Sequence, residues 1–142
     1  MGMLTASLLA AVMTLSAAGD GWRAGVARED ITPAESMWLA GYAARTRPAE
    51  GTIHPLWVKA LAVEDAAGNR GLIITSDILG FPKSLSDRIL ARFEKEASLD
   101  AARVILNSSH THSGPVVDGS LMCIYPLDDT EREKIRRNTA LL

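Results

Sequence analysis

The sequence predicts an incomplete α/β domain, in which a mixed sheet with buried central strands is flanked by helices. Strand-like segments at residues 57–64 and 71–76 precede a helical pattern that opens at Ser84, and a third apolar strand begins at Val104. A second helix is expected after Pro126. Strands that alternate with helices are typical of layered α/β folds. Because segment 71–76 is apolar without alternation, we expect a strand that is covered on both faces.

The segment that opens at Ser84 has the pattern of an amphipathic helix. Ser84 is a favourable residue type for the N-cap position. Leu85, Ile89, Phe93 and Ala97 then recur at helical spacing. This spacing predicts that they form the buried face of the helix.

Residues 34–55 are expected to form a long loop, which follows a short strand predicted at residues 22–26. Glycines and prolines interrupt the segment, and no helical or strand period is visible. Long loops in compact domains are usually functional or disordered. Since Trp38, Leu39 and Tyr42 provide apolar anchors, we expect an ordered loop that lines a site.

Composition excludes some classes of function and site. The net charge is −2, and the sequence has no stripe of basic residues to neutralise the phosphates of a nucleic acid. Nucleic-acid binding is therefore not expected. The single cysteine, Cys123, excludes an internal disulfide and a site built from several thiolates. Because Cys123 lies within the apolar run 121–125, it is expected to be a small buried side chain.

Residues 1–18 have the character of a secretory signal peptide. No charged side chain occurs from Met3 to Ala18, residues 8–13 are continuously apolar, and residues 16–18 are small. The run is shorter than the roughly 20 residues that a helix needs to cross a bilayer, so we expect secretion or export to the periplasm. The region before the apolar run lacks Lys and Arg, which leaves a buried helix or a misassigned start as alternatives. No later segment is long and apolar enough to be a transmembrane span.

The most informative chemistry is a pair of histidines at the end of the third strand. In extended geometry, residues i and i+2 point to the same face, so the imidazoles of His110 and His112 can approach one point. Neutral imidazole is a common zinc ligand, and catalytic zinc keeps an open position for water. Alternatively, Ser108, Thr111 or the backbone satisfies two partly buried histidines. Two imidazoles also fall short of the three or four protein ligands that a zinc site needs.

Other candidates are weaker on sequence grounds. Asp77 lies at the end of its strand, as His110 does at the end of the next. It is therefore expected to orient a histidine, to bind a cation or to cap the turn. His54 is either near the site or an ordinary turn residue. Ser113 follows His112, but no G-x-S-x-G motif surrounds it. Arg45 in the long loop is suited to an anionic group.

Five segments in order resemble the neutral/alkaline non-lysosomal ceramidase family. Residues 110–115, His-Thr-His-Ser-Gly-Pro, are similar to its signature. Upstream, four segments resemble its opening strand and D-I-T-P turn, its G-Y loop, a frequent histidine position and its strand ending in aspartate; they are residues 25–33, 39–43, 53–54 and 72–77. The resemblance covers about residues 22–115.

The resemblance implies an α/β catalytic domain that hydrolyses the N-acyl bond of ceramide, or of a related lipid amide, to a fatty acid and sphingosine. It implies Zn²⁺ as cofactor, with His110 as a metal ligand. His112 would lie beside the metal and contact the substrate or the developing oxyanion. The family's further ligands, a histidine, a glutamate and a tyrosine, lie well downstream. Residues 22–142 are therefore expected to be the amino-terminal portion of a longer zinc amidase, inactive alone.

Two other classes of function stay open at this stage. One is an exported, non-catalytic binding module in which the histidines are structural. The other is an unrelated metalloenzyme with a H-x-H strand, such as an amidohydrolase or a metallo-β-lactamase. The latter is disfavoured because residues 113–115, Ser-Gly-Pro, stand where an Asp-His pair would follow His112.

Overall fold

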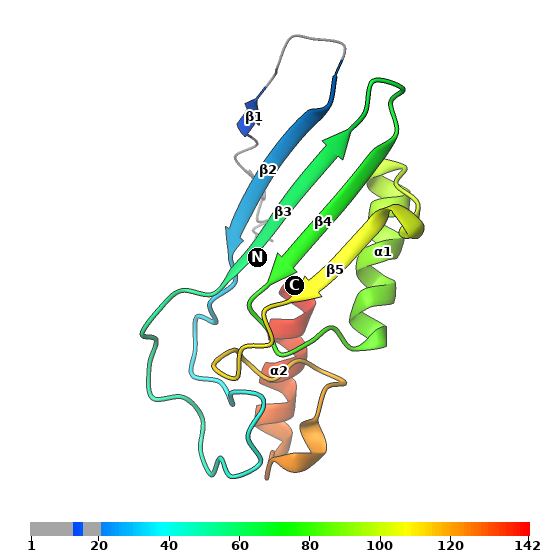
Figure 1. Ribbon diagram of the computed structural model, residues 1–142. Coiled ribbons are helices and arrows are strands. Elements are labelled where there is room, and N and C mark those ends of the chain that lie inside the picture. The colour runs from blue at the N-terminus through cyan, green and yellow to red at the C-terminus, as the bar shows by residue number, and fades with distance from the viewer. Residues whose placement is uncertain (1–12, 16–20) are drawn as a thin grey trace, which may run out of the picture.

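The computed structural model describes residues 13–15 and 21–142, which form a five-stranded mixed sheet and two α-helices (Figure 1). In chain order the elements are β1 (Met13–Leu15), β2 (Arg23–Asp30), β3 (Trp57–Glu64), β4 (Arg70–Ser76), α1 (Lys83–Ala97), β5 (Val104–Ser108) and α2 (Asp129–Leu141), with 3-10 helices at Ala101–Arg103 and Met122–Ile124. The strands are neighbours in chain order. Pairs from β1 to β4 are antiparallel, and β4 pairs with β5 in parallel. The predicted α/β class and mixed sheet are confirmed.

The β3–β4 hairpin forms where the sequence predicts it, and Asp65 organises its turn. The Asp65 carboxylate accepts hydrogen bonds from the backbone N–H groups of Ala67 and Asn69, at 2.9 and 2.8 Å. Gly68 adopts the left-handed backbone conformation, with φ of +80°, which glycine adopts at little cost. Hydrogen bonds from the Asn69 side chain and backbone hold the pKa of Asp65 below its ordinary value.

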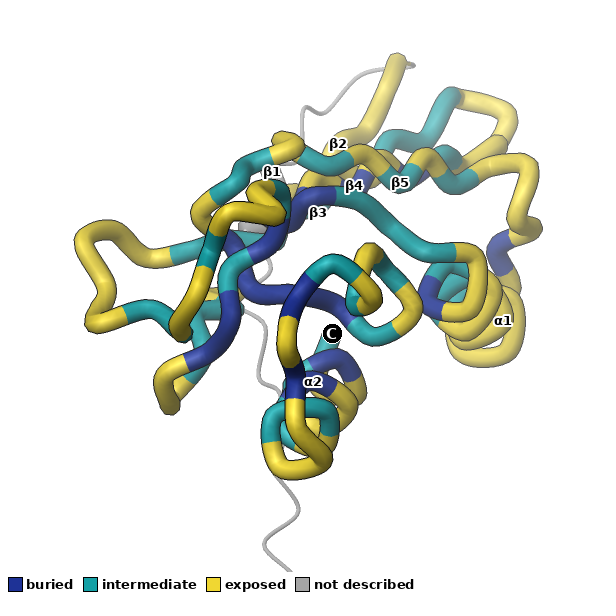
Figure 2. Tube along the Cα trace, turned by 90° about the horizontal axis from the view of Figure 1, so that it is seen from below, coloured by how far each residue is buried: buried dark blue, intermediate teal, exposed yellow. Residues whose placement is uncertain are grey.

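Both helices lie on the same side of the sheet (Figure 2). The connection from β4 to β5 runs through α1, as a parallel strand pair requires. Phe93 of α1 and the buried Leu99 pack against Leu72 and Ile74 of β4. This contact buries one face of the two parallel strands.

The opposite face of the sheet carries an uncovered apolar row. Val26, Leu61, Ile73 and Ile105 are register partners across β2 to β5. Their exposed fractions are 51%, 37%, 37% and 58%. The expectation that segment 71–76 is covered on both faces is therefore wrong for the described chain. The apolar composition of β4 is real, but both helices pack on its other side.

Two local expectations are also wrong. Helix α1 begins at Lys83 with Pro82 at the N-cap, and no side chain caps it, so Ser84 lies inside the first turn. Cys123 is exposed, whereas a buried position was expected. The reason is that Met122–Ile124 form a 3-10 turn, in which Met122 and Ile124 pack against the core and the residue between them does not.

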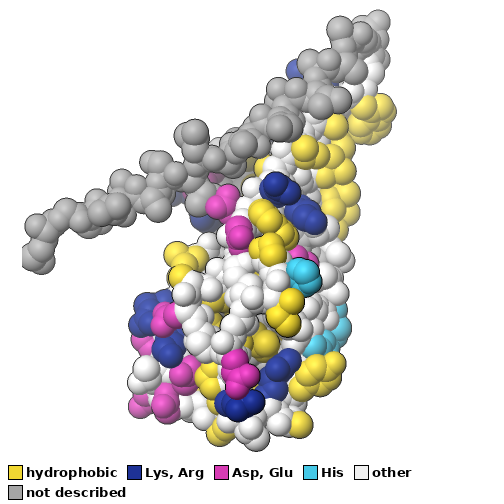
Figure 3. Space-filling view, turned by 90° about the vertical axis from the view of Figure 1, so that its left-hand side faces the viewer, with side chains coloured by type: hydrophobic (Ala, Val, Ile, Leu, Met, Phe, Trp, Pro, Cys, Tyr) yellow, Lys and Arg dark blue, Asp and Glu magenta, His cyan; other side chains and the backbone are white. Residues whose placement is uncertain are grey.

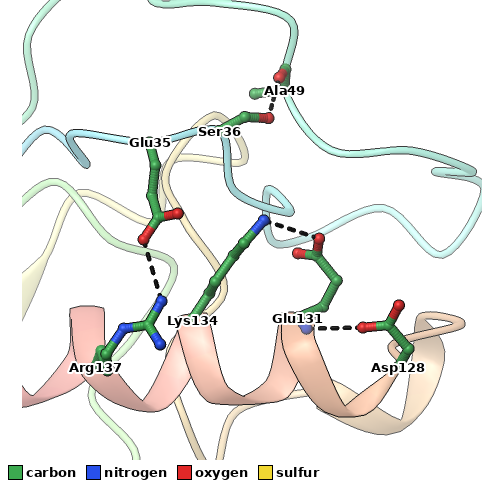
Figure 4. A network of polar contacts seen from close by, with 7 residues as sticks. All are labelled: Glu35, Ser36, Ala49, Asp128, Glu131, Lys134 and Arg137. Carbon is green, nitrogen blue, oxygen red and sulfur yellow. Dashed lines mark hydrogen bonds and ion pairs between the residues drawn. The ribbon is translucent and has the colours of Figure 1, made fainter.

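Helix α2 packs beneath the carboxyl ends of the parallel strands and holds the long loop in place. The side chain of Asp128 caps the helix by accepting the Glu131 N–H at 2.8 Å, which satisfies a helix-terminal donor. Ile135 of α2 is fully buried in the cluster that contains Met37 and Trp38 of the loop. An ion pair joins Glu35 to Arg137 at 3.3 Å, and in the same region the Ser36 hydroxyl donates to the Ala49 carbonyl (Figure 4).

The remaining predictions concern the length of β2 and the signal peptide. Strand β2 extends to Asp30, four residues beyond the predicted strand 22–26. The predicted signal peptide at 1–18 lies outside the described residues except for β1, which pairs with β2. Across residues 13–15 and 21–142, no helix has the length and apolar character of a membrane span.

Candidate functional site

The candidate site is the loop that follows β5 at the carboxyl edge of the parallel strand pair. Strand β5 ends at Ser108. The Ser109 N–H then donates to the Ser76 carbonyl at 2.9 Å, which holds the end of β5 beside the end of β4. In α/β sheets, ligand sites form at such carboxyl edges, where loops leave adjacent strands.

His110 and His112 lie side by side in this loop. Their ring centroids are 5.2 Å apart, with an interplanar angle of 70°. The two rings are close together, as expected. The predicted cause, extended strand geometry, is wrong, because β5 ends at Ser108 and the backbone of His110 is in the left-handed region with φ of +57°. A non-glycine residue in this region usually marks a turn or strain. A turn therefore brings the two rings together.

His110 is exposed, and its hydrogen bond identifies its tautomer. Its Nδ1 lies 2.7 Å from the Leu79 carbonyl oxygen. Because a carbonyl oxygen only accepts, Nδ1 must donate, and the neutral ring then has a free lone pair on Nε2. The Ser108 hydroxyl donates to the same carbonyl at 3.3 Å. The end of β5 is thereby tied to the segment that follows β4.

His112 is half-buried against the long loop. The ring of Tyr42 meets the His112 imidazole edge-on, with centroids 4.5 Å apart. Gly41 lies against the same ring, and a Cβ at this position would overlap the imidazole Cγ and Nδ1. The Nδ1 atom is enclosed and has no hydrogen-bond partner among the described residues.

A short antiparallel contact joins the long loop to the residues after His112. The Ala40 N–H donates to the Gly114 carbonyl at 2.9 Å, and the Val116 N–H donates to the Trp38 carbonyl at 2.8 Å. Leu39 and Pro115 form the bridge between these bonds. The prediction of an ordered loop that lines a site is confirmed by these contacts.

Arg45 is a site residue whose role the sequence did not reveal. Its Nη2 donates to the backbone carbonyl of His112 at 2.7 Å. Its guanidinium also lies over the Tyr42 ring, 5.4 Å from the centroid. Its place in the long loop indicates only that it is suited to an anionic group, and no spacing rule connects it to a residue 67 positions away.

Three of the four weaker candidates, His54, Asp77 and Ser113, line a separate cavity of about 660 Å³ next to the same loop. Its lining includes His54, Asp77, Ser113 and Thr111, but neither His110 nor His112. Thr111 and Ser113 therefore contribute to this cavity, whereas the two histidines do not. Figure 3 accordingly shows histidine side chains at separate places on the surface.

Asp77 has a structural partner in this arrangement. Its Oδ2 accepts the backbone N–H of Trp57 at 2.9 Å, and its own N–H donates to the Trp57 carbonyl at 2.9 Å. These backbone contacts agree with the capping role, while the roles of Asp77 as a histidine partner or a cation ligand stay predictions. Asp77 fastens the end of β4 to the start of β3.

The described residues do not complete a metal site by themselves. Across residues 13–15 and 21–142, no group of three or more His, Cys, Asp or Glu side chains could hold a metal ion. The imidazole pair therefore supplies at most part of the ligand set that zinc requires.

The fold and the site together define an α/β domain that presents two adjacent imidazoles at the carboxyl edge of a parallel strand pair. Residues 22–125 match the family described as "Neutral/alkaline non-lysosomal ceramidase, N-terminal". The chain belongs to this family, as the resemblance in residues 22–115 predicted.

The chain is also similar in sequence and in fold to parts of known proteins. The "Neutral ceramidase" of Pseudomonas aeruginosa is 31% identical over 117 residues, which cover 80% of this chain and 18% of the relative. The crystal structure of neutral ceramidase from Pseudomonas aeruginosa matches 87% of this chain and 21% of its own, with a TM-score of 0.67 and 23% identity. A structure described as "Ceramidase complexed with C2" covers 85% of this chain and 20% of its own, with a TM-score of 0.65. The chain thus spans about a fifth of the length of the relatives that it matches.

The contact between Gly41 and His112 predicts a large effect of one methyl group. Gly41→Ala places a Cβ on the imidazole at a φ of +98°. We expect the free energy of unfolding to fall by more than about 1 kcal/mol, because the substitution adds overlap to backbone strain. Gly51→Ala in the same loop meets no atom within 4 Å, and is expected to change stability by less than about 0.5 kcal/mol. Equal midpoints of urea unfolding for the two variants would contradict the contact.

Proposed function

We propose that the chain contributes part of the active site of a zinc-dependent amidase that hydrolyses the N-acyl bond of ceramide or a related lipid amide. In this proposal His110 is a zinc ligand, and His112 contacts the carbonyl group that is attacked. Membership of the ceramidase family supports the reaction class. The observation that carries the residue roles is the pair of imidazoles 5.2 Å apart, with Nδ1 of His110 bound to the Leu79 carbonyl.

The chemistry of His110 fits a zinc ligand. Histidines that bind metals usually donate the other ring N–H to a carbonyl or carboxylate, which sets the tautomer and orients the ring. The Leu79 carbonyl takes this part, and it leaves the Nε2 lone pair of an exposed ring available. Bound zinc would polarise an amide carbonyl and lower the pKa of water.

His112 is suited to stabilise negative charge beside the metal. Its ring is held by Tyr42 and Gly41 rather than being free to rotate. A ring N–H that is fixed near a reacting carbonyl can donate to the oxygen as charge develops there, and it costs little reorganisation. The remaining zinc ligands must come from residues other than those described here.

These roles can be separated in a chimera. Residues 22–125 of this chain would replace the matching segment of the Pseudomonas aeruginosa neutral ceramidase, and each histidine would be changed to alanine in turn. Zinc content by metal analysis and release of fatty acid from ceramide would both be measured. His110→Ala is expected to lose zinc and activity together. His112→Ala is expected to keep zinc, with kcat reduced by roughly 10²- to 10³-fold, as for loss of one oxyanion donor.

His54→Ala is the matched control in this chimera, because His54 is exposed and lines the separate cavity. It should retain zinc and activity. If His110→Ala kept full zinc in a folded and active chimera, His110 would not be a ligand. A chimera in which all three variants behaved alike would favour the alternative, a non-catalytic module with structural histidines.

We also propose that the protein is exported through a signal peptide at residues 1–18. The support is the uncharged stretch from Met3 to Ala18 with its apolar middle. The secreted or periplasmic protein is expected to begin at Gly19 by amino-terminal sequencing. Leu9→Arg, which places a charge in the apolar run, is expected to keep the chain in the cytoplasm. Intact chains beginning at Met1 or Gly2 in the exported fraction would contradict cleavage.

A further inference from the structure

We propose that Arg45 is a positioning residue that holds His112 in one tautomer, with Nδ1 unprotonated and Nε2 carrying the proton. The catalytic meaning of this inference rests on the proposed function, in which the His112 N–H donates to the reacting carbonyl. The tautomer itself does not depend on that reaction. Arg45 would act through His112 and need not touch a substrate.

Three contacts from one loop segment fix the position of His112. Arg45 Nη2 binds the His112 backbone carbonyl at 2.7 Å. Tyr42 contacts both residues. The centroid of its ring lies 4.5 Å from the centroid of the His112 imidazole and 5.4 Å from Cζ of the Arg45 guanidinium. Gly41 packs against the face of the ring, nearest to Cγ and Nδ1. The Arg45 N–H donates to the Tyr42 carbonyl at 3.2 Å, so these residues also form one turn.

The enclosure of Nδ1 determines which ring nitrogen carries the proton. This atom is buried and has no hydrogen-bond partner within residues 13–15 and 21–142. A neutral imidazole has one donor and one acceptor nitrogen. Buried N–H groups without a partner are rarer in proteins than under-satisfied acceptors, so the lone pair belongs on Nδ1 and the proton on Nε2.

The two imidazoles are then in opposite tautomers, which divides their roles. His110 donates from Nδ1 to the Leu79 carbonyl and keeps a lone pair on Nε2. His112 keeps its lone pair on the enclosed Nδ1 and has its N–H on Nε2. One ring can therefore bind a cation, while its neighbour can donate a hydrogen bond. The hydrogen bond from Arg45 maintains the difference between the two tautomers, because it keeps the His112 ring packed against Gly41.

The inference can be tested by NMR on the full chain with ¹⁵N-labelled histidine, without metal or substrate. The spectra are recorded at alkaline pH, and a neutral imidazole is recognised in them by one protonated and one unprotonated ring nitrogen. Long-range ¹H–¹⁵N correlations distinguish protonated from unprotonated ring nitrogens. In the unsubstituted chain, we expect opposite patterns for His110 and His112. In Arg45→Ala, the ratio of the two His112 tautomers is expected to fall at least fivefold, toward the ratio of a histidine in an unstructured peptide.

Two further variants keep the test decisive. Arg47→Ala is the matched control, because Arg47 is an exposed neighbour in the same loop and pairs with Glu50 at the surface; its His112 pattern should be unchanged. Arg45→Lys retains the charge but has no planar fork, so an intermediate tautomer ratio is expected. His112 with a protonated Nδ1 in the unsubstituted chain would overturn the inference and leave the zinc role of His110 intact. An unchanged His112 pattern in both Arg45 variants would overturn the role of Arg45.

Discussion

The arrangement of the site depends on one backbone pairing, between the long loop at residues 38–40 and the residues 114–116 that follow the histidines. Two hydrogen bonds and the Leu39–Pro115 bridge form it. Without this pairing, Gly41 would not reach the His112 ring and Arg45 would not reach its carbonyl. Pro115 and Val116 are almost completely buried, so the pairing is also part of the core that packs on α2. Site geometry and core packing are thereby coupled.

The sequence predicts the framework well, because the framework depends on local patterns. The β3–β4 hairpin, the α1 pattern and the loop at 34–55 all follow from short-range periodicity and turn residues. The His-x-His pair was found in the same way. Burial was predicted less well: the apolar row that includes Ile73 and Ile105 is exposed, because periodicity does not show which face of a sheet the helices cover.

The details of the site could not be predicted, because they depend on contacts between distant parts of the chain. Gly41 is required by a ring 71 positions later, and Arg45 binds a carbonyl 67 positions away. The closeness of His110 and His112 was predicted from strand geometry, but it arises from a left-handed turn at His110. The tautomers of the two histidines cannot be predicted from the sequence, because they depend on the Leu79 carbonyl beside His110 and on the burial of Nδ1 of His112.

The loop pairing must be stable enough to hold His112, and amide hydrogen exchange measures that stability. The Ala40 and Val116 N–H groups both donate across the pairing. They should therefore exchange nearly as slowly as N–H groups in the middle of β4, since slow exchange follows from stable, buried hydrogen bonds. The Thr46 N–H in the exposed part of the same loop is expected to exchange quickly. If Ala40 and Val116 exchanged as fast as Thr46, the long loop would not hold His112 in place.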